Sequence, residues 1–417
     1  MKNPVTLIVA GAGGRGTGYA SYALAKPRES KVVGVAEPRD YNRGRLAEAH
    51  GIPAGQVFRG WEAMAARPKF ADAVIIATQD RMHSAPAIAF ARKGYAILLE
   101  KPMAPTEAEC RRIAAEVKRA RVTFAVCHVM RYTRYTRALK ALLAGGAIGD
   151  IVSVQHLEPV GFWHQAHSFV RGSWRNSRES SFMLLAKSCH DLDWLRHVVG
   201  VPCTRVSSFG FLKHFRKAER PRGAAPRCLS CRIERTCPYS AKRLYLGMIR
   251  KHQPWWPVDV LTTDLTLPGV TKALREGPYG RCVWACDNDV VDHHVVNFEF
   301  TGKRTASFTM TAFTETRDRR TRIFGTRGEL YGNGQMVWIY DFLTRKKRAI
   351  DTSKAGHGIL GGHGGGDGGL MEAFVKAVAT GDRTGILSGP TESLESHLMV
   401  FAAERARLRG TVERVRL

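Results

Sequence analysis

Short apolar runs alternate with helix-compatible stretches along the first third of the chain. The runs are Val5–Ala10, Lys31–Ala36, Ala73–Ala77, Tyr95–Leu99 and Val122–Cys127. Runs of this length, bounded by glycine and polar residues, are typical of strands that are buried on both faces. Because helices separate them, the pattern predicts a doubly wound parallel sheet.

The rest of the chain follows another pattern, in which polar and apolar residues alternate. The strand-like runs are Ile151–Leu157, Val206–Leu212, His294–Phe300, Thr305–Phe313, Arg320–Gly325 and Met336–Phe342. Alternation predicts a sheet with one covered face and one partly open face. Helices are expected over Arg131–Leu143, from Ser188 to about Gly200, and over Leu370–Ala379 and Thr391–Arg409. We therefore expect an α/β chain with two domains, residues 1–128 and 129–417, and a cysteine-rich insert near residues 203–290.

Composition narrows the classes of molecule that this protein is expected to bind. Lys and Arg number 64 and Asp and Glu 37, giving a net charge of +27. The positive charge is spread over several segments and no nucleic-acid-reading motif accompanies it, so we expect a solvated basic surface and no nucleic-acid partner. No apolar run is long enough to span a membrane. Met1 leads almost directly into the first strand, which leaves no room for a signal peptide and predicts a cytoplasmic protein.

A glycine-rich turn follows the first strand and opens a helix. Gly11, Gly13 and Gly16 have the G-x-G-x-x-G spacing in the strand–turn–helix setting that this motif requires. Gly11 permits the tight turn, Gly13 lets a pyrophosphate approach, and Gly16 lets helix and strand pack closely. Gly14 and Arg15 lie in the same turn and are included in the predicted cofactor site. A dinucleotide-binding Rossmann domain is therefore expected, although a plain glycine-rich turn is the simpler alternative.

The second strand ends in an acid, Glu37, 21 residues after Gly16. A carboxylate at this position accepts hydrogen bonds from the adenosine ribose hydroxyls and repels a 2′-phosphate. This favours NAD as the cofactor. Arg39 and Arg43 are close enough in sequence to leave NADP open.

Lys101 stands at the carboxyl end of a strand, where ligands bind in open α/β sheets. It lies in Glu100-Lys101-Pro102, and the proline ends the strand because it has no N–H to donate. The lysine could hold a positive charge against a substrate hydroxyl, although a solvated Glu–Lys pair is the alternative. Thr78 and His83 lie in a loop at the same sheet edge, where His83 could face the cofactor or simply begin a helix.

Together these segments resemble a known family. They are Gly11-x-Gly13-x-x-Gly16, Thr78 to His83, Glu100-Lys101-Pro102, Arg131-Tyr132 and Gly146-Ala-Ile-Gly149. From Val5 to about Glu404 the chain resembles the glucose–fructose oxidoreductase / inositol dehydrogenase (Gfo/Idh/MocA) family. The resemblance implies a Rossmann domain followed by an α+β domain with a large open, mostly antiparallel sheet. It also implies nicotinamide-dependent chemistry at hydroxyl-bearing carbons of sugars and cyclitols, and a homo-oligomer, dimer or tetramer.

A helix near the middle of the chain carries the second half of the predicted chemistry. Ser188 and Asp191 form an S-x-x-D capping signal. His190 and Asp193 are three residues apart and share one helix face, which we expect to point away from the core. In the resembled family this segment reads D-x-G-x-H-x-x-D, and here Ala186 replaces the first acid and Ser188 the glycine.

The predicted reaction is hydride transfer between nicotinamide and a hydroxyl-bearing carbon of a sugar, sugar derivative or cyclitol. His190 is the expected general base, Lys101 stabilises the alkoxide, and Asp193 positions the imidazole or a neighbouring hydroxyl. The missing acid leaves a second enzyme class open, a redox-neutral NAD-dependent glycosidase that acts through C3 oxidation and elimination. A third reading, a non-enzymatic NAD-sensing or nucleic-acid-binding protein, follows from the charge alone.

Further residues are candidates for contact with substrate. Aromatic and basic side chains gather in the loop over residues 162–176, which could line a sugar site or simply pack. The candidates are Arg131, Tyr132, His164, Trp174 and Lys187. The segment Gly361 to Asp367 is read either as a loop near substrate or as a glycine-rich linker.

Three cysteines in the insert have metal-ligand spacing. Cys228, Cys231 and Cys237 lie within ten residues, and C-x-x-C lets two sulfurs reach one ion. The candidates for a fourth ligand are Cys282, Cys286 and His214. The sequence leaves a structural zinc ion and free thiols equally open.

Overall fold

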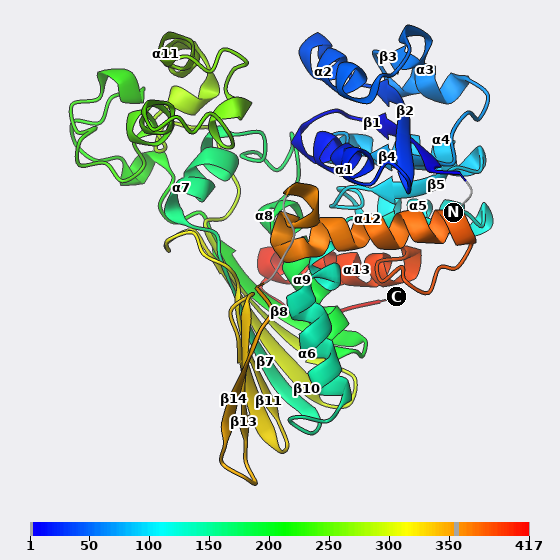
Figure 1. The fold of residues 1–417 in the computed structure, drawn as a ribbon. Coiled ribbons are helices and arrows are strands. Elements are labelled where there is room, and N and C mark those ends of the chain that lie inside the picture. The colour runs from blue at the N-terminus through cyan, green and yellow to red at the C-terminus, as the bar shows by residue number, and fades with distance from the viewer. Residues whose placement is uncertain (1–2, 354–357, 417) are drawn as a thin grey trace.

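The computed structural model describes residues 3–353 and 358–416 and contains two sheets (Figure 1). One lies in the N-terminal part of the chain and the other runs through the C-terminal part. Residues 1 and 2, on which the expectation about a signal peptide partly rests, are outside the described residues. Among the described residues, no helix is long and apolar enough to cross a membrane.

The first sheet has six parallel strands in the order β3-β2-β1-β4-β5-β6. They are β1 (Val5–Ala10), β2 (Ser30–Ala36), β3 (Val57–Phe58), β4 (Ala73–Ile76), β5 (Ala96–Leu99) and β6 (Phe124–Val126). Every residue of β4 and β5 is buried, as their continuous apolar runs predict. The strand order is that of the Rossmann fold, which confirms the predicted fold class of this half.

Five helices connect these strands. They are α1 (Gly14–Ala25), α2 (Asp40–His50), α3 (Trp61–Ala66), α4 (Ser84–Arg92) and α5 (Glu107–Arg119). Local sequence explains their ends: the Thr106 side chain accepts a hydrogen bond from the Glu109 N–H at the start of α5, and Gly51 ends α2 in the left-handed conformation.

The second sheet has nine strands in the order β14-β13-β12-β11-β7-β10-β9-β8-β15. They are β7 (Ile151–Pro159), β8 (Cys203–Phe211), β9 (His293–Phe300), β10 (Arg304–Thr311), β11 (Arg320–Gly325), β12 (Gly328–Gly332), β13 (Met336–Asp341), β14 (Lys347–Asp351) and β15 (Glu413–Arg414). All pairs are antiparallel except β7 with β10. The mostly antiparallel sheet is therefore confirmed. Sequence analysis missed β12, β14 and β15, which are short and carry glycine or charged residues.

Three helices cover one face of the second sheet: α6 (Arg134–Ala144), α9 (Cys189–Val199) and α13 (Pro390–Arg409) (Figure 1). The apolar residues of α9, among them Leu192, Leu195 and Val199, are buried as predicted, and Gly200 ends this helix. Helix α13 also packs against α5, so it connects the two halves of the molecule.

The C-terminal helix α12 (Gly362–Thr380) packs on the first domain. Its residues Leu370, Met371, Phe374 and Val375 belong to the same hydrophobic cluster as the apolar side chains of β1. Near its start, residues 363–365 have positive φ angles and form a sharp turn. The segment that the sequence left open as a linker is therefore a structured helix start.

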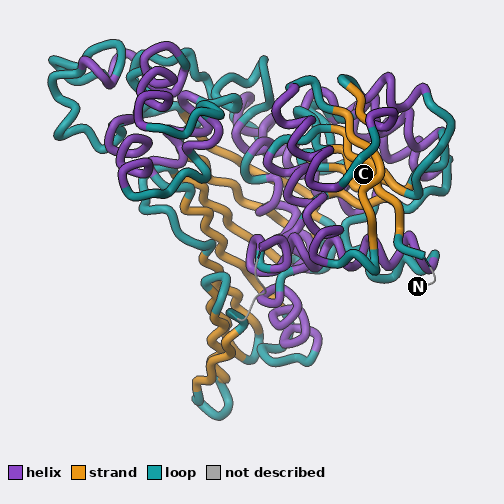
Figure 2. The backbone as a smooth tube through the Cα atoms, turned by 45° about the horizontal axis from the view of Figure 1, so that its top comes forward, coloured by secondary structure: helices purple, strands orange, loops and turns teal. Residues whose placement is uncertain are grey.

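Between β8 and β9 the chain forms a separate lobe, residues 212–290, which we call the insert lobe (Figures 1 and 2). Its regular helices are α10 (Gly247–Arg250) and α11 (Leu267–Glu276), and much of the remainder is loop. Beside it lie α7 (Phe162–His164) and a π-helical turn over Gln165–Arg171, whereas α8 (Met183–Ala186) packs against α13 and α9. The lobe has a small core of its own, around Tyr245, Val258 and Leu274.

Candidate active site

A large cleft is lined by residues of both halves of the chain. It contains about 1570 Å³ of empty space, counting the part open to solvent. Residues predicted from the sequence that line it are Gly13, Gly14, Arg15, Thr78, Glu100, Lys101, His164, Trp174, Lys187 and His190. The cleft therefore connects the glycine-rich turn of the first domain with side chains of the second domain.

The glycine-rich turn provides the expected cradle at one end of the cleft. Gly11 has φ of 96°, and a Cβ there would lie 2.5 Å from the carbonyl oxygen of Ala77. A Cβ on Gly16 would collide with the carbonyl oxygen of Gly11. Gly14 faces open space at the N-terminus of α1, where free N–H groups attract an anion. These features fit a bound pyrophosphate.

Glu37 lies at the end of β2 but is almost fully buried, and only its neighbour Arg39 lines the cleft. The carboxylate accepts hydrogen bonds from the Ala12 N–H at 2.8 Å and from Arg39 Nε at 2.7 Å. Burial would raise the pKa of Glu37, but the hydrogen bonds from Arg39 and Ala12 outweigh it and lower that pKa. A charged carboxylate therefore stands beside the glycine turn.

Glu100 joins three parts of the chain beside the cleft. It accepts a hydrogen bond from Arg15 Nε at 2.8 Å, and the Arg15 guanidinium also contacts Asp367 of α12 at 2.7 Å. The Asp367 carboxylate in turn contacts His363 Nδ1 at 2.8 Å, and His363 lines the cleft. The Glu100 carboxylate also accepts a hydrogen bond from the Lys101 N–H at 2.6 Å. This network fixes the backbone that carries Lys101.

Lys101 and His190 line the same cleft. Lys101 follows β5 of the first sheet, whereas His190 lies on α9, which packs on the second sheet. Lys101 Nζ donates a hydrogen bond to the carbonyl oxygen of Ala186 at 2.8 Å, and no described carboxylate forms an ion pair with it. Nδ1 of His190 is buried and has no hydrogen-bond partner among the described residues. Burial, and then the positive charge of Lys101, lower the pKa of His190 well below its usual value. The imidazole is therefore neutral and able to accept a proton.

A charged network that the sequence did not reveal forms another wall of the cleft. Arg319, just before β11, contacts Glu158 at 2.9 Å and Asp191 at 2.6 Å, and Glu158 also binds Lys187 Nζ at 3.0 Å. Burial would lower the pKa of Arg319, but the two carboxylates raise it. Glu158 and Arg319 lie in separate strand-end segments, so no local motif could have joined them.

Asp193 does not line the cleft, although the sequence placed it on the same helix face as His190. Its side chain is fully buried and accepts two hydrogen bonds from Arg131, each 2.7 Å long. The expectation that this polar face points away from the core is therefore wrong. Behind His190, the ring of His128 lies between the two residues, 3.5 Å from Asp193 and 6.1 Å, ring centre to ring centre, from His190.

Other predicted residues also lie outside the cleft. Arg131 forms an ion pair with Asp193. The Tyr132 hydroxyl accepts a hydrogen bond from the Leu387 N–H at 2.8 Å. His83 is fully buried, and its ring nitrogens contact the carbonyl oxygens of Pro102 and Thr78. These three side chains hold loops that border the cleft.

The predicted S-x-x-D cap at the start of α9 is also wrong in detail. The helix does begin after Ser188, but that side chain caps no N–H group. Asp191 instead binds Arg319 and contacts His156 at 3.2 Å. Arg319 pairs with this carboxylate because a charge-assisted pair is stronger than a hydrogen bond from a neutral N–H group.

Aromatic side chains form the side of the cleft that faces the insert lobe. His164 and Trp174, both predicted, are joined there by Phe169 and Trp256. The rings of His164 and Trp256 are 5.1 Å apart and nearly perpendicular. Trp256 was not predicted, because it lies in the insert, far in sequence from His164 and Trp174.

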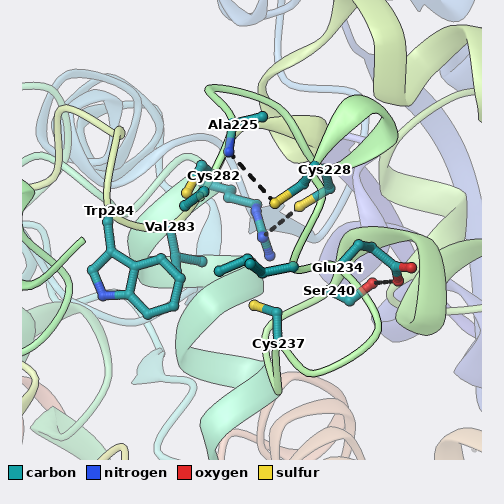
Figure 3. A pocket seen from close by; sticks show the side chains of 12 residues that line it. Ala225, Cys228, Glu234, Cys237, Ser240, Cys282, Val283 and Trp284 are labelled. Atoms are coloured by element: carbon teal, nitrogen blue, oxygen red, sulfur yellow. Dashed lines mark hydrogen bonds between the residues drawn. The ribbon is translucent and has the colours of Figure 1, made fainter. Parts of the chain in front are cut away.

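The cysteines of the insert lobe surround a second, smaller pocket (Figure 3). Cys228, Cys231, Cys237 and Cys282 line it. Among the described residues, no three His, Cys, Asp or Glu side chains are already arranged to hold a metal ion. All nine cysteines are free of disulfide bonds.

Comparison with known proteins agrees with this architecture. The chain is 30% identical over 206 residues to inositol 2-dehydrogenase 1 of Saccharopolyspora erythraea, which covers 49% of this chain and 57% of that protein. It is 32% identical over 147 residues to 2,7-anhydro-N-acetylneuraminate hydratase of Escherichia coli, 35% of this chain and 38% of the hydratase. A levoglucosan dehydrogenase solved with NADH and levoglucosan has the same fold, with a TM-score of 0.72 and 19% identity over the full length of both chains.

Two family matches together cover most of the chain. Residues 5–128 match the oxidoreductase family with an NAD-binding Rossmann fold, and residues 140–391 match the C-terminal alpha/beta domain of the same family. The matches follow the two sheets seen in the structure. The chain therefore belongs to the Gfo/Idh/MocA oxidoreductase family.

Proposed function

We propose that this protein is an NAD-dependent oxidoreductase that acts on a hydroxyl-bearing carbon of a sugar, sugar derivative or cyclitol. One observation carries the proposal: Lys101 of the first domain and His190 of the second line one cleft that also contains the glycine-rich turn. The cradle of Gly13 and Gly14 fits a dinucleotide, and the cation and the neutral imidazole fit the chemistry of a carbinol.

When bound, a nicotinamide dinucleotide supplies the carbon that accepts the hydride. Lys101 donates a hydrogen bond to the substrate oxygen and stabilises its developing negative charge, since no described carboxylate forms an ion pair with this lysine. His190, whose ring borders the cleft, accepts the hydroxyl proton as the general base. Asp193 is a positioning residue in this scheme, and it acts on His190 through the intervening ring of His128.

A carbohydrate substrate is favoured by the cleft walls. Trp174, Trp256 and Phe169 offer apolar faces to C–H groups, while Lys187 and Arg319 offer N–H donors to hydroxyl groups. Inositol 2-dehydrogenase and levoglucosan dehydrogenase, which this chain resembles in sequence or fold, are named for polyhydroxylated ring substrates.

NAD is favoured over NADP because the charged carboxylate of Glu37 would repel a 2′-phosphate. Arg39 is engaged by Glu37, and Arg43 contacts the Glu37 carbonyl oxygen at 2.7 Å, so neither arginine is free of protein partners. NADP as cofactor and zinc as a structural metal stay predictions.

A redox-neutral reaction is the second candidate. The resemblance to a hydratase that acts on an anhydro sugar favours it, as does Ala186 at the position of the missing acid. In that scheme bound NAD would be the oxidant of a ring carbon, the same Lys101 and His190 would assist that step, and the hydride would return after a group has been eliminated.

A panel of sugars, glycosides, anhydro sugars and cyclitols with NAD would test the proposal. NADH absorbance and product formation are followed together for the wild-type protein and for Lys101→Met. Net NADH with an oxidised product supports the dehydrogenase, whereas product without net NADH supports the redox-neutral reaction. Dinucleotide binding without turnover of any compound in the panel would contradict both.

We also propose a cytoplasmic homo-oligomer that forms through the uncovered face of the second sheet. Phe209 of β8 lies directly opposite Val295 of β9, and both are exposed together with the nearby Phe211. Exposed apolar side chains grouped in this way are typical of an interaction surface. Light scattering of the purified protein would contradict this proposal if it gave the mass of a single chain.

A further inference from the structure

We propose that Cys228, Cys231, Cys237 and Cys282 bind a metal centre through their four thiolates. The occupant is a metal with affinity for sulfur, either a zinc ion or an iron–sulfur cluster, and its role is to hold the insert lobe together. The site is distinct from the cleft, and the proposal does not depend on the proposed reaction.

Backbone pairing brings the two cysteine segments together. Arg227 and Arg281 form an antiparallel bridge, and the Cys282 N–H donates to the Pro226 carbonyl oxygen at 2.8 Å. Cys228 and Cys282, 54 residues apart in sequence, therefore follow two paired positions. Two strand-like segments that each present cysteine at a bend are a common arrangement in thiolate metal sites.

The four sulfur-bearing side chains border one small hollow, and Figure 3 labels Cys228, Cys237 and Cys282 around it. The sequence left Cys282, Cys286 and His214 open as the fourth ligand, and only Cys282 borders the hollow. The Cys286 thiol instead donates to the Cys282 carbonyl oxygen at 3.3 Å, and His214 packs among Tyr239 and Trp284. The structure thus selects a set of four cysteines.

An arginine on the same hollow lacks a negatively charged partner. Arg171 is 1% exposed and donates to the carbonyl oxygens of Arg281 and Tyr239, and its guanidinium lies 3.5 Å from Cys228 Sγ. No described carboxylate forms an ion pair with it. A buried cation is costly unless a negative charge compensates it. A metal centre with four thiolates is negatively charged overall, so it would supply that charge.

The insert lobe also needs a crosslink. Its core consists of a few side chains around Tyr245, Leu246, Val270 and Leu274, and little of its backbone lies in regular elements. Small units with such cores are usually held by disulfides or a metal. Its cysteines form no disulfide, and a metal centre would supply such a crosslink.

Binding requires the thiols to rotate and to lose their protons. Burial raises the pKa of Cys237 and of Cys282, so both are protonated thiols without metal. As a zinc ion or an already assembled iron–sulfur cluster binds, each of the four S–H bonds breaks, a metal–sulfur bond forms, and four protons pass to solvent. Neither of these two binding steps changes an oxidation state, so no oxidant or reductant is required.

The test measures metal and sulfide in the full-length protein purified without oxygen and without chelator. Zinc at about one per chain with no visible absorption identifies a zinc ion. About four iron and four acid-labile sulfide per chain, with a brown colour, identify an iron–sulfur cluster. Either result supports the site. Metal and sulfide near zero overturn it, provided that chelator-treated protein titrated with Co²⁺ also shows no cobalt–thiolate absorption.

Matched variants test which sulfurs are ligands. Cys228→Ser and Cys282→Ser should lose most of the bound metal, whereas Cys286→Ser, in the same segment but away from the hollow, should retain it. Equal loss in Cys286→Ser and Cys282→Ser would overturn the assignment of ligands. If a variant fails to fold, the Co²⁺ titration of the wild-type protein still decides, because four-thiolate coordination gives intense absorption that water or histidine ligands do not.

Discussion

The wall of the cleft and the polar cluster directly behind it use the same kinds of side chain in opposite ways. At the wall, Lys101 forms no ion pair with a described carboxylate, and the ring of His190 borders the cleft. Behind it, Asp193 and Arg131 neutralise each other with almost no access to solvent. The groups that border the cleft are available to a ligand, whereas the buried, paired charges serve to hold the structure.

The buried cluster supports the cleft from a distance. His397 of α13 accepts a hydrogen bond from the Met103 N–H at 2.9 Å, just after Pro102. Burial lowers the pKa of His128 to about 3, although the nearby Asp193 opposes that shift. His128 is therefore neutral, so the charge of Asp193 in this cluster is balanced by the charge of Arg131.

Removal of the buried charge is expected to have the largest effect on stability. Asp193→Asn leaves Arg131 charged and unpaired in the core, which should lower the free energy of unfolding by about 3–5 kcal/mol. Chemical denaturation monitored by tryptophan fluorescence measures this loss. Glu299→Gln, which breaks the exposed pair with Arg205, is the matched control and should change stability little.

The pair also predicts a pH dependence. Burial would raise the pKa of Asp193, but Arg131 lowers it to about 2, from a usual value near 4. The pair therefore stabilises the protein fully above about pH 4, and this contribution disappears as the pH falls towards 2. The comparison fails if Asp193→Asn is as stable as the wild-type protein, because the buried pair would then not hold the structure together.

Loss of the free cation is expected to have the largest effect on turnover. Lys101→Met should lower kcat by at least about a hundredfold, since the alkoxide loses its positive partner. Affinity for NADH, measured by fluorescence titration, should stay similar. Near-normal turnover in this variant would show that Lys101 does not touch the reacting oxygen.

Removal of the general base is expected to lower turnover by as much as Lys101→Met, or slightly less. His190→Asn removes the proton acceptor and should lower kcat by about a hundredfold, with little loss of stability. Because the pKa of His190 is lowered, the wild-type enzyme should keep this base neutral below the ordinary histidine range. A pH–rate profile measures this, and a variant with an unchanged profile and rate would remove His190 from the mechanism.

The smallest effect is expected from the aromatic side of the cleft. Trp256→Ala removes a ring that could stack on substrate and should raise KM about two- to tenfold, with kcat nearly unchanged. Steady-state kinetics on the substrate found in the panel separate the two parameters. An exposed ring of the same lobe, Trp255→Ala, serves as the control and should leave KM unchanged.

The sequence predicted what depends on local pattern. Continuous and alternating apolar runs predicted both sheets, and the glycine spacing predicted the cradle at Gly11 to Gly16. The strand-end position of Lys101 and the family pattern around His190 also placed both residues on the border of one cleft. The sequence could not predict which side chain pairs with a buried carboxylate. Asp193 pairs with Arg131, 62 residues away in sequence, and Asp191 pairs with Arg319, 128 residues away in sequence. Such pairings depend on packing between distant segments.

The position of α12 has a consequence for synthesis of the chain. Side chains near residue 370 complete the core beneath β1, which leaves the ribosome long before them. The nucleotide-binding half therefore exposes apolar surface until α12 has emerged. Chaperone demand during translation should be high for this protein, and a shortened gene that encodes only the first sheet should yield an aggregating product.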